Sequence, residues 1–383
     1  MQPKILFLDQ SGKLGGAELS LLDVAEPYRE TCLVGLFADG TFRQALEHRH
    51  IPVDILTEQT IQVQKENGVL KSLGSFRTLI PLIGKVTQLA RQYDVIYTNT
   101  QKAFVVGAIA SALGRRPLVY HLRDILSVEH FSQTNLKVAV TLANLFADVV
   151  IANSEATRQA FIDAGGRANL TTVIYNGFQT EKYQVPTAKV NQIRQNLGVE
   201  NQFVIGHFSR LSPWKGQHIL LEALPHCPEN MTVLLLGDAL FGEDEYVDQL
   251  HQTVERLQLQ DRVKILGFQT DIIPLMAASD MITHTSTAPE PFGRVIIEAM
   301  LCDTPIVVAA AGGVLELIEH NRTGWLVSPE NPEELAQVIN TCYQNPEMTQ
   351  VMTQAAKIQA AQRFDLEKIR QQIQDRLEIV SHS

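Results

Sequence analysis

Two glutamates lie eight positions apart in the stretch EPFGRVIIEAM, with a Pro-Phe-Gly-Arg turn and an apolar run between them. If the whole stretch were helical, Glu290 and Glu298 would lie about 80° apart on the helix surface. Pro291 and Gly293 instead predict that a helix begins near Gly293 or Arg294. Glu290 then lies in the preceding loop and Glu298 in the second helical turn, so that one acid flanks each side of a helix start.

Two cations follow an expected strand at Phe203–Phe208, in the loop SRLSPWKG. Arg210 and Lys215 would lie at the carboxyl end of that strand, where a helix start is expected at Ser212 or Pro213. A guanidinium group and an ammonium group at such a place suit a diphosphate. Two solvated charges on a surface loop are the alternative, which weakens because other turns suited to phosphate recur in the same half of the chain.

Glycine-rich turns precede expected helices at two further places. Gly15 and Gly16 follow the first expected strand, and Gly312 and Gly313 follow a strand at Ile306–Ala309. Glycine lets the backbone approach a ligand closely, and a helix N-terminus offers free N–H groups and a partial positive charge to a phosphate. A tight turn that binds nothing is the alternative for the first pair. Backbone amides and cations can bind a phosphate, and carboxylates can accept hydrogen bonds from sugar hydroxyls. Together these groups suit a sugar-nucleotide site.

His121, in the stretch VYHLRD, is the one histidine of 11 that we place at a strand end as a ligand-facing residue. A lone histidine is more often structural than catalytic. The four cysteines form no Cys-x-x-Cys pair, and no Asp-x-Asp pair follows a strand in a setting suited to a metal. The sequence therefore predicts no metal and no cofactor, with Arg210 and Lys215 neutralising the phosphate charge instead.

Short β-rich runs alternate with helical patterns along the chain, which predicts βαβ units and parallel sheets. The pattern restarts after a polar stretch, Gln179–Gln202, so we expect two doubly wound α/β domains over 1–180 and 203–362, with a linker over 181–202. The helix expected in 363–383 could cross back to the first domain. A ligand held by both domains would lie in a cleft between them. The expected strands are Ile5–Leu8, Leu33–Phe37, Val53–Leu56, Val95–Thr98, Leu118–His121, Val149–Ala152, Val173–Tyr175, Phe203–Phe208, Thr232–Leu236, Val263–Phe268, Met281–His284, Ile306–Ala309 and Trp325–Val327.

The composition is that of a soluble globular protein, with 45% hydrophobic and 19% charged residues. Residues 1–180 carry 17 Lys and Arg against 16 Asp and Glu, a formal charge of +1, whereas 181–383 carry 15 against 26, a charge of −11. General binding of nucleic acid is not expected for such a chain. The sequence opens on a strand pattern rather than a signal peptide, and we expect a cytoplasmic protein.

The segment Lys65–Tyr93 is a candidate membrane-facing patch, because its basic residues lie beside apolar ones. Glu66 is the only acidic residue in this segment of the sequence. An ordinary amphipathic helix with a solvated basic edge is an equally good interpretation. The basic residues are Lys65, Lys71, Arg77, Lys85 and Arg91, and the apolar residues are Leu79, Ile80, Leu82, Ile83 and Val86.

In this order the motifs resemble the retaining glycosyltransferases of family 4, which have the GT-B architecture of two Rossmann-like domains facing across a cleft. The resemblance covers nearly the whole chain. It runs through GGAE at 15–18, His121, NS at 153–154, IYNG at 174–177, Arg210 with Lys215, GD at 237–238, GF at 267–268, Glu290 with Glu298, Gly312 with Gly313, and GWLV at 324–327.

The resemblance implies a role for each acid of the opening stretch. Glu290 would lie beside the donor sugar and its hydroxyl groups, and Glu298 would hold the ribose hydroxyls. The loop amides of Phe292, Gly293 and Arg294 would touch the sugar and the phosphate.

The other matched residues also gain expected roles from the resemblance. Arg210 and Lys215 would neutralise the diphosphate as it leaves, and Gly16 would approach it from the first domain. His121 would lie against the donor sugar, and Phe268 would lie near the base through its backbone.

The function implied is transfer of a hexose from a nucleotide sugar, with UDP-glucose as the default donor, to a glycan or lipid-linked acceptor. Exopolysaccharide or other bacterial cell-surface polysaccharide synthesis is the expected setting, with possible peripheral contact at the inner face of the plasma membrane. Two alternatives remain: a nucleotide-sugar epimerase of the same fold, and a non-catalytic scaffold that binds a sugar nucleotide. The set of Arg210, Lys215, Glu290 and Glu298 argues against a scaffold.

Overall fold

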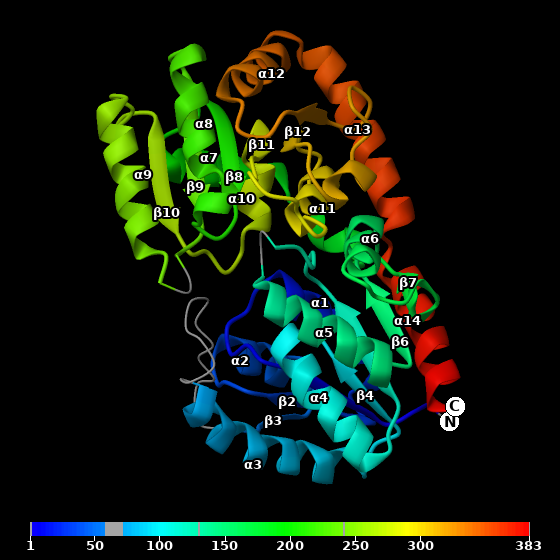
Figure 1. The fold of residues 1–383 in the computed structure, drawn as a ribbon. Coiled ribbons are helices and arrows are strands. Elements are labelled where there is room, and N and C mark those ends of the chain that lie inside the picture. The colour runs from blue at the N-terminus through cyan, green and yellow to red at the C-terminus, as the bar shows by residue number, and fades with distance from the viewer. Residues whose placement is uncertain (1, 58–71, 129–130, 240–241, 383) are drawn as a thin grey trace. The chain divides into compact units, whose positions relative to one another are not determined.

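The computed structural model describes residues 2–57, 72–128, 131–239 and 242–382 (Figure 1). The chain forms two compact units, which we call unit 1 (Met1–Gly177 with Leu366–Ser383) and unit 2 (Phe178–Asp365). The stretch 181–202 was predicted as a linker, but it contains helix α7 (Thr187–Leu197) and belongs to unit 2. Arg194 of α7 explains this, because it donates hydrogen bonds to Asp280 at 2.9 Å and to the carbonyl of Ala278 at 3.0 Å.

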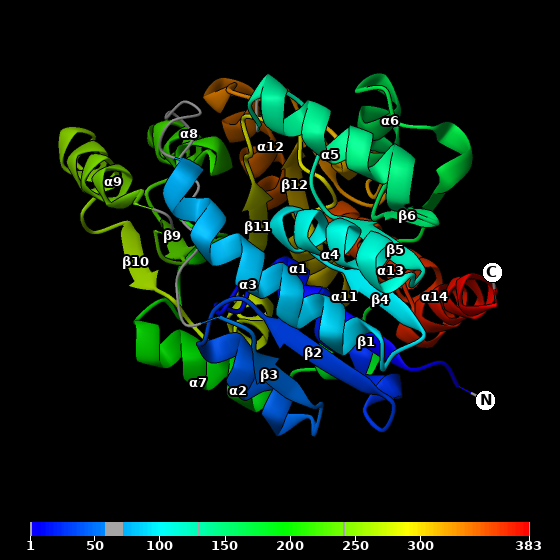
Figure 2. The ribbon, with the colours of Figure 1, turned by 60° about the horizontal axis from the view of Figure 1, so that its bottom comes forward.

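Unit 1 is built on a parallel seven-stranded sheet in the order β3-β2-β1-β4-β5-β6-β7. Both faces of this sheet are buried, because alternate residues of a strand enter two different cores. In β1, Ile5 and Phe7 enter one core, and Leu6 and Leu8 enter the other. Helices α3, α4 and α5 lie side by side over the second core (Figure 2).

The strands of unit 1 are β1 (Ile5–Asp9), β2 (Cys32–Leu36), β3 (Val53–Ile55), β4 (Val95–Thr98), β5 (Leu118–Leu122), β6 (Val149–Ala152) and β7 (Thr171–Val173). Its helices are α1 (Gly16–Ala25), α2 (Thr41–His48), α3 (Ser72–Ala90), α4 (Gln101–Gly114), α5 (Gln133–Phe146), α6 (Glu155–Asp163) and α14 (Leu366–Ser381), with 3₁₀ turns η1 (Glu26–Tyr28) and η3 (Ala168–Leu170). The last strand was expected over Val173–Tyr175 and lies two residues earlier.

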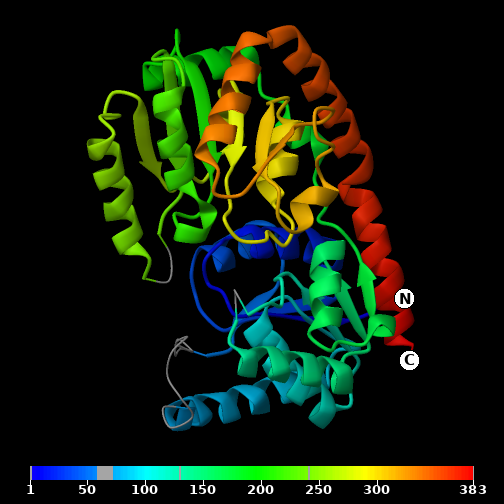
Figure 3. The same ribbon diagram turned by 45° about the horizontal axis from the view of Figure 1, so that its top comes forward.

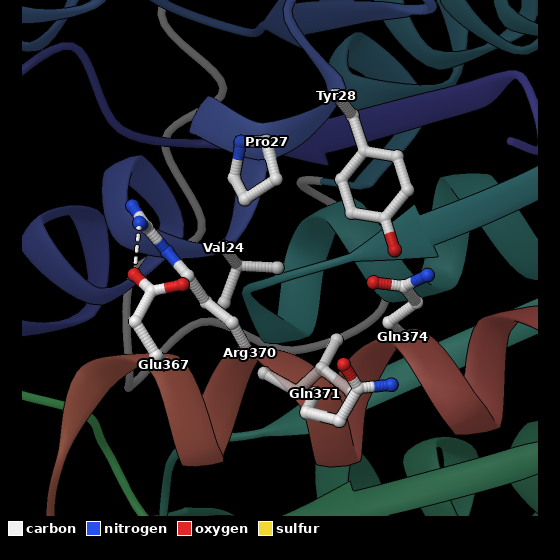
Figure 4. A pocket seen from close by; sticks show the side chains of 8 residues that line it. Val24, Pro27, Tyr28, Glu367, Arg370, Gln371 and Gln374 are labelled. Carbon is white, nitrogen blue, oxygen red and sulfur yellow. Dashed lines mark hydrogen bonds and ion pairs between the residues drawn. The ribbon is translucent and has the colours of Figure 1, made fainter.

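Helix α14 completes the first core of unit 1, although it comes from the far end of the chain. Its residues Ile369, Ile373 and Leu377 are buried in that core. Arg370 fastens the helix at the corner between α1 and η1, where it donates to the carbonyl of Asp23 at 2.8 Å and pairs with Glu26 at 2.5 Å. Figure 4 shows Arg370 beside Glu367, in a small polar pocket that also takes in the hydroxyl of Tyr28 and the amide of Gln374.

Unit 2 repeats this plan with a parallel six-stranded sheet in the order β10-β9-β8-β11-β12-β13, drawn in green to orange in Figure 3. Its strands are β8 (Phe203–Phe208), β9 (Met231–Leu236), β10 (Val263–Gly267), β11 (Met281–His284), β12 (Ile306–Ala309) and β13 (Trp325–Val327). Its helices are α7, α8 (Gln217–Ala223), α9 (Asp244–Arg256), α10 (Ile273–Ala277), α11 (Arg294–Leu301), α12 (Pro332–Gln344) and α13 (Pro346–Arg363), with 3₁₀ turns η4 (Thr180–Tyr183), η5 (Pro213–Lys215), η6 (Leu224–His226) and η7 (Gly313–Glu316).

A buried pair of acids lies at the carboxyl end of the unit 1 sheet. Asp9 ends β1 and is fully buried, and Glu18 lies in the first turn of α1 and is 8% exposed. Asp9 accepts a hydrogen bond from Asn99 at 2.7 Å, and Asn99 in turn accepts one from Arg123 at 2.5 Å. Burial raises the pKa of Asp9 to about 6, and burial together with the negative charge of Asp9 raises the pKa of Glu18 to about 8.

The packing of α14 predicts that unit 1 loses much of its stability when this helix loses a core side chain. Ile373→Ala should lower the free energy of unfolding by about 2–5 kcal/mol, because Ile373 is 2% exposed. Ile379→Ala on the same helix is the control and should change it by less than about 0.5 kcal/mol, because Ile379 is 63% exposed. Urea unfolding compares the two. Equal effects would contradict the observed docking of α14.

The acid pair predicts a pH dependence of stability. Because the folded-state pKa of Glu18 lies above its ordinary value of 4.5, the folded protein binds the extra proton between these values, and the free energy of unfolding falls as pH rises from about 4.5 to about 8. Glu18→Gln should flatten this fall by more than about 1 kcal/mol between pH 5 and pH 8, since one pKa unit is worth about 1.4 kcal/mol. Glu30→Gln, at a side chain 87% exposed, is the control. Parallel pH profiles for Glu18→Gln and the wild type would exclude the effect.

Candidate active site

Each sheet has one point where the strand order reverses, and ligands of such sheets bind at the carboxyl ends of the strands there. In unit 1 the point lies between β1 and β4, and in unit 2 it lies between β8 and β11. The predicted residues Gly15 and Gly16 follow β1. Arg210 and Lys215 follow β8, and Glu290 follows β11. These residues therefore lie at the carboxyl ends of their strands, as expected from the sequence.

Lys215 and Glu290 form the centre of the unit 2 site. Lys215 Nζ lies 2.6 Å from Glu290 Oε2 and 4.0 Å from the centre of the Trp214 ring. Both side chains are largely buried, with 15% and 11% of their surface exposed. Burial opposes ionisation of the carboxyl group, but the Lys215 ammonium and hydrogen bonds from His284 hold the pKa of Glu290 well below its usual range. Glu290 is therefore a carboxylate at physiological pH.

The backbone of Glu290 is clamped by the turn that follows β12. The Glu290 amide donates to the carbonyl of Ala311 at 3.1 Å, and the Gly313 amide donates to the carbonyl of Glu290 at 2.7 Å. Gly312 has a φ of 78°, and a Cβ there would lie 2.5 Å from that same carbonyl oxygen. The amide of Gly313, which we expected at a phosphate, is thus used to hold Glu290. The phosphate role of Gly312 and Gly313 stays a prediction, and the helix expected after them is only the 3₁₀ turn η7.

Arg210 lies on the same loop as Lys215, after β8. Its Nε is 3.4 Å from Glu243 Oε2, and Ser212 donates to Glu243 Oε1 at 2.7 Å. Thr285, which follows β11, donates to the carbonyl of Gly216 at 2.7 Å and so ties the cationic loop to the neighbouring strand. The two cations are thereby brought to the carboxyl ends of β8 and β11.

Helix α11 begins where the sequence predicted. It starts at Arg294, after Gly293 with a φ of 87°, and Glu298 is in its second turn. Arg294 Nε lies 3.4 Å from Glu298 Oε1, and the Arg294 guanidinium lies over the ring of Phe178 at 4.5 Å. The ring of Phe292 is 2% exposed and packs on Phe178, so only its backbone can serve a ligand.

Phe268, unlike the buried Glu290, Phe292 and Glu298, is exposed. Its ring is 53% exposed, and its amide donates to Asp238 Oδ1 at 3.2 Å. The amide is therefore engaged within the protein. A contact between Phe268 and a base, if made through the backbone, would use the carbonyl group.

In unit 1, Gly15 caps α1 and Gly16 is its first residue. The backbone amides of Gly15 and of Glu18 itself partly offset the rise that burial causes in the pKa of the Glu18 carboxyl group. A Cβ on Gly15 would lie 2.8 Å from Glu18 Oε2, so the acid covers this glycine closely. Glu18 thus fixes the turn at the start of α1, and the donor-binding role of Gly15 and Gly16 stays a prediction.

His121 is 1% exposed and belongs to the buried polar network of Asp9, Asn99 and Arg123. Its Nδ1 contacts the Tyr97 hydroxyl and lies 3.2 Å from Arg123 Nη2, so Nδ1 accepts from both and the neutral ring carries its proton on Nε2. Burial, and then the positive charge of Arg123, hold the pKa of His121 well below its usual value. Nε2 is buried and has no hydrogen-bond partner among the described residues. His121 can therefore donate a hydrogen bond but is not poised as a general acid.

Sequence reasoning missed several residues that complete these clusters. His284 and Ser286 contact Glu290, Glu243 contacts Arg210, and Asn99 and Arg123 support Asp9. His121 was singled out as the one strand-end histidine, but His284 also ends its strand, β11. The same strand-end rule would have found it.

The structure describes only part of the expected membrane patch. Lys65 and Lys71 lie outside the described residues, whereas Leu82 and Val86 of α3 belong to the core and Ile80 is 67% exposed. In the described part of the chain, no helix is long and apolar enough to cross a bilayer. In that same part, no group of three or more His, Cys, Asp and Glu side chains is arranged to hold a metal ion.

The chain is similar over nearly its whole length to the Anabaena protein Alr3699/HepE. The crystal structure of that protein in complex with UDP-glucose has 59% sequence identity and a TM-score of 0.92, and the match covers 98% of this chain and 99% of that chain. Crystal structures of the same protein with UDP, and with UDP and glucose, match with TM-scores of 0.89 and 0.92.

Curated relatives are more distant. Spore coat protein SA of Bacillus subtilis is 30% identical over 213 residues, which cover 52% of this chain and 56% of that protein. N-acetyl-alpha-D-glucosaminyl L-malate synthase of Bacillus anthracis is 27% identical over 297 residues, 76% of each chain. The chain spans 56%, 65% and 53% of the length of the first three curated relatives.

Two family models divide the chain between the two units. The model described as "Glycosyltransferase Family 4" matches residues 14–182, and the model described as "Glycosyl transferases group 1" matches residues 189–359. The predicted fold class is confirmed, because each match falls on one Rossmann-like, doubly wound sheet, as in GT-B glycosyltransferases. With the near-complete likeness to Alr3699/HepE, these matches establish that the chain belongs to the family 4 glycosyltransferases.

Proposed function

We propose that the protein transfers a hexose from a UDP-sugar, with UDP-glucose as the first candidate, to a glycan or lipid-linked acceptor. The observation that carries this proposal is the unit 2 site, in which Lys215 pairs with the carboxylate of Glu290 and Arg210 lies on the same loop after β8, at the carboxyl ends of β8 and β11. The likeness to Alr3699/HepE, solved in complex with UDP-glucose, supports the choice of donor.

The chemistry follows from where charge develops. When the bond between the sugar and the diphosphate breaks, negative charge grows on the leaving oxygen, and preorganised cations there stabilise the transition state. Lys215 and Arg210 are such cations. The Glu290 carboxylate accepts hydrogen bonds from sugar hydroxyls, and Glu298, at the second turn of α11, does the same for the ribose. These roles require no metal ion, and we propose that transfer proceeds without one and with retention of the anomeric configuration.

Polysaccharide assembly is the proposed setting. A related Escherichia coli protein is named UDP-Gal:alpha-D-GlcNAc-diphosphoundecaprenol alpha-1,3-galactosyltransferase, and one from Staphylococcus aureus is named for capsular polysaccharide biosynthesis. These names suggest an exopolysaccharide or cell-surface glycan as product, and we propose that the protein acts in the cytoplasm. Product analysis without an acceptor separates transfer from the epimerase alternative, since an epimerase would convert the UDP-sugar alone.

The proposal predicts a UDP-specific site that persists in EDTA. Calorimetric titration with UDP, GDP and ADP should show the tightest binding for UDP, and EDTA should leave the affinity unchanged. Lys215→Ala should weaken UDP binding and lower kcat/KM for the UDP-sugar by about 10²–10³, equivalent to roughly 3–4 kcal/mol of lost transition-state stabilisation. Lys189→Ala is the control, because that side chain is 52% exposed on α7.

Each alternative gives a different result in this titration. A preference for GDP or ADP would overturn the donor while leaving the family unchanged. Loss of binding in EDTA would overturn the metal-independent mechanism. Binding of none of the nucleotides would leave the scaffold interpretation.

We further propose that unit 1 makes peripheral contact with an anionic membrane. Helices α3, α4 and α5 contain no Asp or Glu, although the whole chain carries a charge of −10. Exposed apolar side chains lie on each of them: Ile80 (67%), Leu113 (60%) and Leu145 (67%). A basic surface with apolar side chains is the composition that binds anionic lipid.

Sedimentation with vesicles tests this contact. Vesicles of phosphatidylglycerol and phosphatidylcholine should bind the protein at low salt, and vesicles of phosphatidylcholine alone should not. Lys85→Glu with Lys137→Glu should lower binding tenfold or more, at about 1 kcal/mol for each basic residue lost. Lys189→Glu in unit 2 should have no effect. Absence of binding to anionic vesicles at low salt would remove the proposal.

A further inference from the structure

Three hydrogen-bond donors converge on a single oxygen of Glu290. Lys215 Nζ lies 2.6 Å from Oε2, the Ser286 hydroxyl donates to it at 3.1 Å, and His284 Nε2 lies 3.2 Å away. Among the described residues, the other carboxylate oxygen, Oε1, has no hydrogen bond and no ion pair. A carboxylate offers about four acceptor positions, two on each oxygen, so this arrangement leaves one oxygen free.

His284 is held in place by the sheet rather than by a loop. It ends β11, which lies between β8 and β12, and it pairs in register with Val308 of β12. The residue is 4% exposed. Since Glu290 can only accept, Nε2 must carry the proton that points at Oε2. The imidazole is therefore a fixed donor with a defined tautomer.

The surroundings of Nδ1, the other ring nitrogen of His284, indicate that the histidine serves the hydrogen bond from Nε2 to Glu290. Nδ1 is buried and has no hydrogen-bond partner among the described residues. A buried polar atom without a partner costs free energy, and an apolar side chain of similar volume would fill the same space without that cost. Space filling alone does not account for a histidine at the end of β11.

Once a sugar nucleotide binds, Lys215 alone would hold the Glu290 carboxylate poorly. Its ammonium is a compact point charge that a diphosphate also attracts, so the two anions compete for it. His284 and Ser286 donate to the same oxygen independently of Lys215, and the Ser286 hydroxyl carries no charge that would attract a phosphate. They can hold the carboxylate in one orientation while Lys215 shares its charge with the diphosphate.

We propose that His284 is a positioning residue: with Ser286 and Lys215 it saturates Oε2 of Glu290 and so presents Oε1 to a hydroxyl group of the donor sugar. The inference rests on the proposed function, because it requires that the sugar of a UDP-sugar meets Glu290. On this proposal, recognition of the sugar depends on the three residues around Oε2 of Glu290. Recognition of the nucleotide depends on other residues.

Calorimetry with two ligands tests the inference, because UDP lacks the sugar and UDP-glucose carries it. His284→Leu removes the N–H group at Nε2 and keeps most of the side-chain volume. The affinity of this variant for UDP should stay within about twofold of the wild type. Its affinity for UDP-glucose should fall about tenfold, which corresponds to 1.4 kcal/mol. His284→Gln can restore an N–H donor near the position of Nε2 and should recover most of the loss.

Ser286→Ala provides a second and smaller change. It removes another donor to Oε2 without disturbing β11 and should show the same selective loss of UDP-glucose affinity, with UDP affinity retained. UDP binding by each variant also reports that unit 2 is folded.

The possible failures are distinguishable. Equal losses for UDP and UDP-glucose in both variants would mean that His284 and Ser286 are merely structural. Unchanged UDP-glucose affinity in both would show that Glu290 needs no such support. Either result overturns the role of His284 while the wild type still binds UDP-glucose. A wild type that binds no UDP-sugar would overturn the proposed function, and the role of His284 with it.

Discussion

The ion pair between Lys215 and Glu290 is the interaction on which the unit 2 site depends. Removing two charges from water is costly, and an ion pair in the interior is tolerated only when further hydrogen bonds satisfy it. Glu290 meets this condition with His284 and Ser286 on its side chain. Its backbone is held separately by the amide of Gly313, and this close approach explains why a glycine with a positive φ, Gly312, lies directly against the loop.

The two units solve the same problem of buried charge in different ways. In unit 2 a cation lies within 2.6 Å of the acid and keeps it ionised. In unit 1 two acids, Asp9 and Glu18, are buried together, and Asn99 bridges Asp9 to Arg123 by hydrogen bonds. Burial then prevails over the attraction of the cation, and the pKa of each acid rises. One sheet edge therefore presents a fixed carboxylate, whereas the other holds acids that are protonated far more readily.

Much of the fold could be predicted from the sequence, because parallel strands buried on both faces give short apolar runs with clear ends. Strands such as β8, β11 and β12 were placed to the residue, and so was the start of α11 after Gly293. Stretch 181–202 was wrongly predicted as a linker. Its helix α7 has no buried residue, so it carries no apolar stripe to mark it, and Arg194 attaches it instead.

The candidate site was predicted less completely than the fold. Motif residues such as Lys215 and Glu290 could be found because each follows a strand. The strand-end rule could also have found His284, whereas Glu243 reaches Arg210 through a tertiary contact that no local pattern encodes. The amide of Gly313 illustrates the limit, because a glycine-rich turn predicts a free amide but does not predict that Glu290 takes it.

A crystal structure of this protein with UDP-glucose would show which groups the bound donor meets. We expect Lys215 Nζ to lie within hydrogen-bonding distance of a diphosphate oxygen and Oε1 of Glu290 to accept a hydrogen bond from a hydroxyl of the glucose. We also expect His284 and Ser286 to remain on Oε2. A glucose ring without contact to Glu290, or a diphosphate bound away from both Lys215 and Arg210, would contradict the account.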